Sequence, residues 1–136
     1  MPRTYSGEDI KIIQLFEALT GAEVVDFYRN NQLVFIVREG HMGLALGRNK
    51  KNIQRLREVY KQRIKIVESS NDLKRFIKQL LFPIKPLEVK IEEETIIIKA
   101  ASSQDKAMII GREKKNLKAI QEALRQKGCN KKIIVE

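Results

Sequence analysis

One short pattern occurs twice in the chain, and it limits the possible folds more than any other feature. Residues 47–53 read GRNKKNI and residues 111–117 read GREKKNL, an offset of 64 positions. The same offset carries Val25 onto Val89, so the register extends to segments outside the pattern. Two copies are too few for a solenoid, in which many repeats stack on one another. The repeat therefore predicts a tandem pair of domains.

We place the first predicted domain at residues 1–69 and the second at residues 70–136. Only Ser69, Ser70 and Asn71 separate the last predicted strand of the first copy from the first helix of the second. A linker this short does not allow independent tumbling, so we expect the two domains to move as one semi-rigid body.

Hydrophobic spacing predicts the same order of elements in both copies. Ser6 can cap a first helix that Gly21 can end, and the apolar spacing from Leu73 to Leu81 predicts the matching helix, with Pro83 beyond it. We expect strands at 23–29, 32–38, 63–68, 87–93, 95–100 and 132–135, and further helices at 40–46, 51–61, 103–110 and 115–126. The predicted fold class is α/β of the α+β kind. Each domain has the order α-β-β-α-α-β, with a three-stranded sheet covered by helices.

The positive charge is confined to two windows that begin at the repeated glycines. The chain has a net charge of +10, from 27 Lys and Arg against 17 Asp and Glu. Residues 47–66 hold eight basic groups against one acidic group, and residues 111–132 hold eight against two. Such windows favour a polyanionic partner.

Each repeated glycine lies between a short and a longer predicted helix, with an apolar residue before it and basic residues after it. This arrangement resembles the GXXG signature of KH domains, and the order α-β-β-α-α-β resembles their type II variant. The tandem pairing is similar to archaeal NusA-like transcription factors. The family usually has glycine at the fourth position of the signature, where this chain has Lys50 and Lys114. If that position needs a positive φ, lysine costs about 1 kcal/mol there.

The expected site is the turn and its flanking residues. A glycine without a Cβ lets a sugar–phosphate backbone come close, and the helix that follows offers free N–H groups to a phosphate. The resemblance implies that such a turn clamps about four nucleotides of single-stranded RNA over an apolar groove, to which Ile36 would add. We assign RNA binding to Leu46, Gly47, Arg48, Asn49, Lys50, Lys51, Asn52, Ile53, Ile110, Gly111, Arg112, Glu113, Lys114, Lys115, Asn116 and Leu117.

The resemblance implies a role in transcription elongation or termination with RNA polymerase. Two alternatives stay open: an RNA-binding protein of ribosome assembly, and a polymerase-docking module whose RNA contact has degenerated. Asn52 and Asn116 either contact RNA or pin the longer helix.

Nothing in the sequence indicates catalysis, a metal or a cofactor. Cys129 is the only cysteine, and His41 has no acidic or cysteine partner nearby in sequence, so a local hydrogen bond is its expected role. No apolar stretch approaches the length that spans a bilayer. We expect a cytoplasmic monomer, with Tyr28 exposed for stacking on a base.

Overall fold

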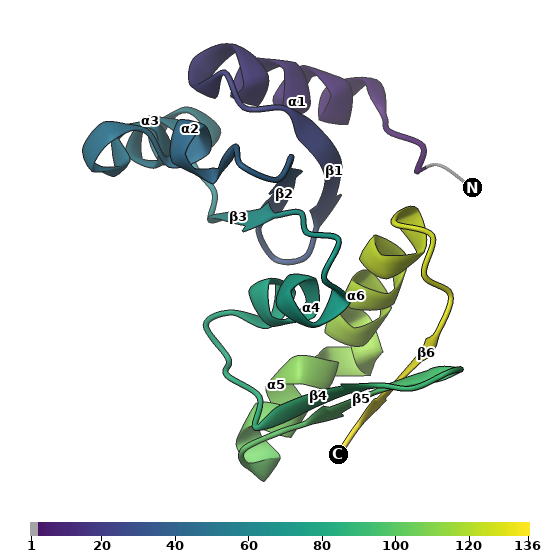
Figure 1. Cartoon of the computed structure of the whole chain (residues 1–136). Helices are drawn as coiled ribbons and strands as arrows, with labels where there is room; N and C mark the ends of the chain where they lie inside the picture. Colours follow the sequence, from purple (N-terminus) through teal and green to yellow (C-terminus); the bar gives the residue numbers. More distant parts are fainter. Residues whose placement is uncertain (1–2) are drawn as a thin grey trace. The chain divides into compact units, whose positions relative to one another are not determined.

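The structure, a computed structural model, describes residues 3–136. It divides into two compact units: unit 1 ends at Ser70 and unit 2 begins at Asn71. Both units have the predicted order α-β-β-α-α-β, with a short 3-10 turn added between the last two helices, and each contains one three-stranded sheet (Figure 1). The predicted α+β class is confirmed.

The two sheets have the same topology. In each, the first two strands are antiparallel neighbours, and the last strand lies parallel to the second. The elements of unit 1 are α1 (Gly7–Thr20), β1 (Val24–Arg29), β2 (Leu33–Val37), α2 (Met42–Leu46), η1 (Arg48–Lys50), α3 (Lys51–Tyr60) and β3 (Ile64–Glu68). Those of unit 2 are α4 (Leu73–Leu81), β4 (Glu88–Ile91), β5 (Thr95–Lys99), α5 (Ser103–Ile110), η2 (Arg112–Lys114), α6 (Lys115–Gln126) and β6 (Lys132–Val135).

Local signals set the ends of the first helices as the sequence predicts. The Ser6 side chain accepts a hydrogen bond from the Asp9 N–H at 3.1 Å, and Gly21 ends α1 in the left-handed conformation at φ 77°. In unit 2 the Asp72 side chain caps α4, which ends at Leu81, and Phe82 separates it from Pro83.

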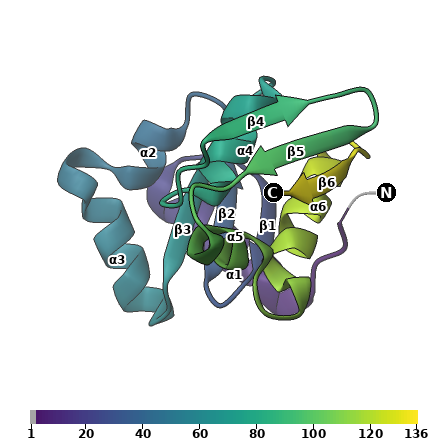
Figure 2. The same cartoon turned by 90° about the horizontal axis from the view of Figure 1, so that it is seen from below.

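In each unit the helices pack on one face of the sheet. In unit 1 the rings of Phe16 and Phe35 stack at 4.1 Å, and Leu56 of α3 is fully buried in the same cluster. In unit 2 the core includes Phe76 of α4 and Ile96 of β5, both fully buried. Figure 2 shows β5 between β4 and β6, with α4 and α6 behind this sheet. Burial of these side chains supplies most of the driving force for each unit.

The offset of 64 holds at the turns and fails in the hairpins. Val37 and Ile98 occupy the same position, because the carbonyl of each accepts a hydrogen bond from the residue that follows the last strand of its unit. Val24 pairs with Val37 and Val89 pairs with Ile98, so Val24 is the counterpart of Val89. The predicted match of Val25 with Val89 is wrong, because a β-bulge follows Val24 and leaves Val25 half exposed.

The same bulge gives unit 1 a buried carboxylate. Asp26 is 5% exposed and accepts hydrogen bonds from Arg3 at 2.7 and 2.9 Å and from the Tyr5 hydroxyl at 3.1 Å. Burial, and then the Asp26 carboxylate, raise the pKa of Tyr5. In unit 2 the corresponding strand position is Lys90, which is exposed.

Candidate nucleic-acid interface

The two repeated turns have nearly identical backbones. Gly47 lies at φ 72° and ψ 171°, and Gly111 lies at φ 76° and ψ 169°. Side chains are essentially excluded from this region of conformational space. The backbone by itself therefore requires glycine at the first position of both turns.

The third and fourth positions of each turn are left-handed, although none of them is glycine. Asn49 and Lys50 have φ angles of 55° and 58°, and Glu113 and Lys114 have φ angles of 56° and 61°. The positive φ on which the predicted cost of lysine depends is thus present in both copies. Each such residue costs about 1 kcal/mol, and strain of this kind persists where the surrounding structure or a function maintains it.

Asn52 and Asn116 pin the helix that follows each turn. The side-chain amide of Asn52 donates to the Leu44 carbonyl at 3.0 Å, and that of Asn116 donates to the Met108 carbonyl at 2.7 Å. Each bond ties the start of the longer helix back to the short helix before the turn. The sequence left two roles open for these asparagines, contact with RNA and pinning of the longer helix. The two bonds correspond to the pinning role.

The asparagines also occupy the space beside the glycines. A Cβ added to Gly47 would lie 2.6 Å from Asn52 Cγ, and one added to Gly111 would lie 2.9 Å from Asn116 Cγ. Contacts under 3.0 Å are essentially never made by real Cβ atoms. The missing Cβ therefore makes room for the chain's own asparagine, and the approach of a sugar–phosphate backbone to the turn stays a prediction.

The helices that begin at these turns differ from the other long helices in how they start. Side chains of Ser6, Asp72 and Ser102 cap α1, α4 and α5, whereas α3 and α6 have no side-chain cap. Lysines stand at both uncapped starts, where the positive end of the helix dipole disfavours them. A bound anion would reverse that balance, because it would add an acceptor at a helix start that no side chain caps and would neutralise the lysines.

The exposure of the sixteen predicted site residues follows one pattern in both copies. The apolar residue and glycine that open the segment are half-buried, the next four residues are exposed, and the last two are half-buried. Over the residues that the structure describes, no ion pair with a carboxylate involves the basic side chains of either turn, which are Arg48, Lys50, Lys51, Arg112, Lys114 and Lys115. Each turn thus presents three cationic groups to solvent.

Two exposed apolar residues beside the turns were missed in the sequence. Leu44 is 48% exposed and Met108 is 45% exposed, and their carbonyls are those that accept the asparagine bonds. The repeat carries Leu44 onto Met108, so the pattern itself could have identified them. Ile36, which was expected to line the groove, is fully buried and cannot contact a base.

Tyr28 is also unavailable for the predicted stacking. It is half-buried, with the Arg3 guanidinium 5.5 Å from the centre of its ring. Burial, with a smaller effect from Asp26, raises the pKa of Tyr28 to about 12. The prediction that Tyr28 is exposed is therefore wrong.

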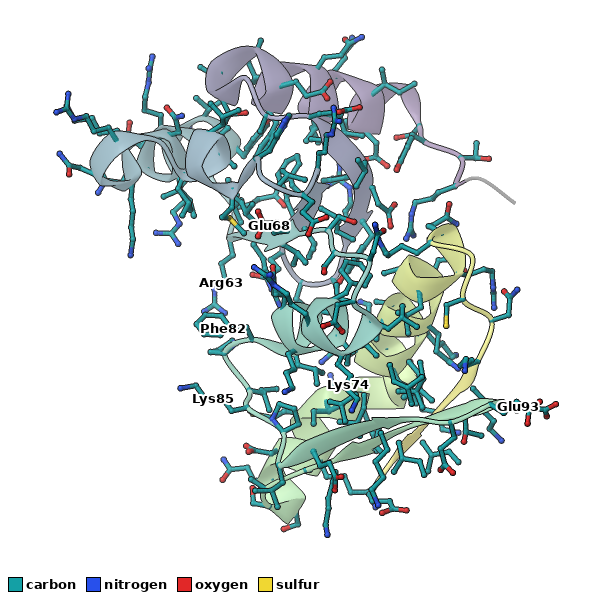
Figure 3. All side chains as sticks on the ribbon, in the orientation of Figure 1. Arg63, Glu68, Lys74, Phe82, Lys85 and Glu93 are labelled. Atoms are coloured by element: carbon teal, nitrogen blue, oxygen red, sulfur yellow. The ribbon has the colours of Figure 1, made fainter. Side chains whose placement is uncertain are left out.

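The remaining polar candidates lie outside the turns. His41 Nδ1 accepts a hydrogen bond from the Glu23 N–H at 3.0 Å, a structural bond to a residue 18 positions away and not the local one that the sequence predicts. Glu93 lies at the tip of the β4–β5 hairpin, away from the helices of unit 2 (Figure 3). Across residues 3–136, no group of three His, Cys, Asp or Glu side chains could hold a metal ion, and no helix is long and apolar enough to cross a membrane.

Comparison with known proteins identifies related chains. The model of the KH domain family matches residues 11–79. A probable transcription termination protein NusA from Methanococcus vannielii is 34% identical over 114 residues, which cover 81% of this chain and 66% of that protein. A protein of the same name from Methanocaldococcus jannaschii is 27% identical over 135 residues, covering 95% and 74% of the two chains.

A solved structure has the same fold over nearly the whole chain. The crystal structure of APE1850 superposes with a TM-score of 0.68 at 31% identity, covering 97% of this chain and 100% of that one. The likeness therefore includes both units, whereas the family model matches mainly the first.

Proposed function

The chain belongs to the KH domain family as an archaeal NusA-like member, and from this premise we propose that it is an RNA-binding factor of transcription elongation or termination. It has no catalytic activity in this role. It binds single-stranded RNA through the turns at Gly47 and Gly111, one in each of two RNA-binding domains, and it acts with RNA polymerase as a cytoplasmic monomer. The relatives named as NusA favour transcription over ribosome assembly.

One observation carries the proposal. Both units contain an uncapped helix start with left-handed lysines, built on a glycine and pinned by an asparagine. Neither the lysines nor the missing caps stabilise the protein by themselves. Together they form a place where a phosphate group would meet the positive end of a helix dipole and ammonium groups, and the same arrangement occurs twice.

The exposed Leu44 and Met108 complete the proposed interface. A phosphate at the turn would place the adjoining base over the neighbouring short helix, where these side chains offer apolar surface. KH domains hold single-stranded nucleotides in this general way, with the backbone at the GXXG turn. Because a hydrophobic side chain accepts any base, this contact adds affinity with little sequence preference.

The test is the salt dependence of RNA binding. Affinity for a single-stranded oligonucleotide should fall with a log–log slope of about −0.7 for each phosphate neutralised. A turn variant with Lys50→Gln, Lys51→Gln, Lys114→Gln and Lys115→Gln should bind more weakly and with a shallower slope. The matched control replaces four exposed lysines outside the turns by glutamine: Lys78, Lys90, Lys99 and Lys132.

Equal affinity of the turn and control variants would show that net charge, and not the turns, binds RNA. A wild-type chain that binds no RNA but is retained by purified RNA polymerase would favour the docking alternative.

A further inference from the structure

Unit 1 has an open hollow at the end of α3 that lies farthest from its turn. The hollow measures about 470 Å³ and combines three cationic side chains with two amide side chains over a buried apolar floor. We call it the basic hollow, and it is lined by Gln32, Arg57, Lys61, Gln62, Arg63 and Ile64.

Backbone hydrogen bonds fix the walls of the basic hollow. The Leu33 N–H donates to the Arg63 carbonyl at 2.9 Å, which joins the β1–β2 turn to the start of β3. The Lys61 N–H donates to the Arg57 carbonyl at 2.9 Å, which closes the end of α3. Figure 3 shows the Arg63 side chain extending away from the ribbon at the start of β3. The cationic groups therefore stand on a rigid frame.

The charges of the basic hollow are not compensated by the protein. Arg57, Lys61 and Arg63 are exposed, and none of them forms an ion pair with a carboxylate of residues 3–136. Unit 2 differs at the same place, because Arg125 pairs with Glu122 at 2.8 Å. The Lys127 ammonium lies 4.9 Å from the centre of the Phe76 ring. Among residues 3–136, the three cationic groups at this end of α3 have no carboxylate partner, whereas at the end of α6 Arg125 has one.

Lys61 occupies a backbone conformation that does not suit it. It ends α3 at φ 53° and ψ 34°, where glycine or asparagine is the usual residue. In unit 2 the turn after α6 uses Gly128 at φ 86°. Directly after α6 stands Lys127 at φ −90°, and Gly128 follows it, so unit 1 gives to lysine the left-handed conformation that unit 2 gives to glycine, which supports a role for the ammonium group.

A line of polar side chains connects the turn of unit 1 to the basic hollow. Gln54 and Arg57 are three residues apart and lie on one side of α3, Lys50 and Lys61 stand at its two ends, and all four are exposed. The 10 residues of α3, at 1.5 Å per residue, span about 15 Å between the two ends of this line. A strand of RNA leaving the turn could follow it.

We propose that the basic hollow binds phosphate groups of the RNA strand beyond the nucleotides held at the turn of unit 1. This proposal rests on the proposed function and extends its footprint. Arginine side chains bind phosphate with two parallel hydrogen bonds, and the glutamine amides add neutral donors. The polar line begins at the turn proposed to bind RNA and ends at the basic hollow. This continuity favours one RNA strand over an acidic protein segment, because such a segment would not need to contact the turn.

The experiment compares RNA lengths. A hollow variant with Arg57→Gln, Lys61→Gln and Arg63→Gln and a control variant with Lys90→Gln, Lys99→Gln and Lys132→Gln lose the same charge. Each is titrated with oligouridine of four and of ten nucleotides. We expect the hollow variant to bind the longer RNA about tenfold more weakly than the control does, with a smaller salt slope, and to bind the shorter RNA like the control.

Equal affinities of the two variants for the ten-nucleotide RNA would overturn the proposal. So would an equal loss on both RNA lengths, because the hollow would then act through the turn or through general charge. If the hollow variant keeps its RNA affinity but is no longer retained by purified RNA polymerase, the hollow is a protein-binding site and the proposal is wrong. If the wild-type chain binds neither RNA, the proposed function itself fails and the proposal falls with it.

Discussion

In unit 1 the third residue of the turn is Asn49, at φ 55° and ψ 30°, and in unit 2 it is Glu113, at φ 56° and ψ 30°. Asparagine visits the left-handed region readily and carries no charge, whereas glutamate is less suited to it and repels phosphate. The turn segment from the glycine to the second lysine therefore carries a net charge of +3 in unit 1 and +2 in unit 2.

The comparison separates what holds the turn from what binds at it. The glycine, the asparagine that packs against it and the bond to the short helix are the same in both units. The exposed residue between them differs, because it makes no contact that the turn needs. We infer that the two units share one phosphate-binding frame and that unit 1 binds RNA more strongly.

The largest expected effect concerns a feature that only unit 1 has. Asp26→Ala should lower the free energy of unfolding by about 3 kcal/mol, because it leaves the half-buried Arg3 guanidinium without its buried carboxylate partner. Lys90→Ala, at the same strand position of unit 2, is the control and should change it by less than about 0.5 kcal/mol. Both are measured by urea denaturation. Similar small changes for both variants would mean that the buried pair contributes little to unit 1.

The next effect tests the frame itself. Gly47→Ala and Gly111→Ala should each lower the free energy of unfolding by about 2 kcal/mol, because alanine is strained at these angles and its Cβ meets the asparagine. The contact at Gly47 is with Asn52 side-chain atoms, whereas at Gly111 it includes the Asn116 backbone nitrogen at 2.9 Å.

Removing the asparagine side chain should therefore rescue the two units differently. Asn52→Ala should recover part of the stability of Gly47→Ala, and Asn116→Ala should recover less of that of Gly111→Ala. Thermal denaturation of the four single and two double variants measures this difference. Equal rescue in both units would contradict the packing described for the glycines.

A smaller effect exchanges the residue that distinguishes the turns. Glu113→Asn should tighten RNA binding about fivefold, because it removes a negative charge that adds about 1 kcal/mol of repulsion near a phosphate in water. Asn49→Glu should weaken binding by a similar factor. Fluorescence anisotropy with labelled single-stranded RNA measures both. If neither exchange changes affinity, the third position lies outside the RNA contact.

The smallest effect concerns one position of the last strand. Burial lowers the pKa of Lys65 to about 8, whereas its counterpart Lys132 is exposed. At a pH between the pKa of Lys65 in the folded chain, about 8, and its ordinary pKa of 10.5, the unfolded chain binds more protons than the folded chain. The stability that depends on this group therefore rises with pH.

The wild-type protein should therefore gain about 1 kcal/mol relative to Lys65→Met between pH 8 and about pH 9.5. Lys132→Met should show no such difference. Burial raises the pKa of Tyr28 and Tyr60 to about 12. Because every protein compared retains both tyrosines, their contribution to the pH dependence cancels in the difference. A pH-independent difference would show that Lys65 is not desolvated in the folded protein.

Much of the fold could be predicted because its signals are local. The helix caps, the prolines and the apolar spacing lie within a few residues of the helix ends that they set, and both copies have the same order of elements. The hairpins of the two copies could not be aligned from the sequence. The β-bulge after Val24 adds a residue to the first hairpin, and no local sequence pattern predicts it. The half-buried Tyr28 ring contacts the guanidinium of Arg3, which is distant in sequence.

The candidate site was predictable in its residues and less so in its geometry. The repeat located the turns, and the charge windows indicated a polyanion. That Asn52 fills the space beside Gly47 depends on how the chain folds back across the turn. The basic hollow was not predicted, because Gln32 joins it from the β1–β2 turn, distant in sequence from Arg57 and Lys61.

The most direct test of the central claim follows backbone amide signals by NMR while single-stranded RNA of about four nucleotides is added to the intact chain. The account predicts that residues 47–53 shift at low RNA concentration and that residues 111–117 shift at higher concentration, with both sets reaching saturation. Shifts in both segments at the same concentration would contradict the inferred difference between the units. If the signals of neither segment shift, the phosphate-binding frame itself is contradicted.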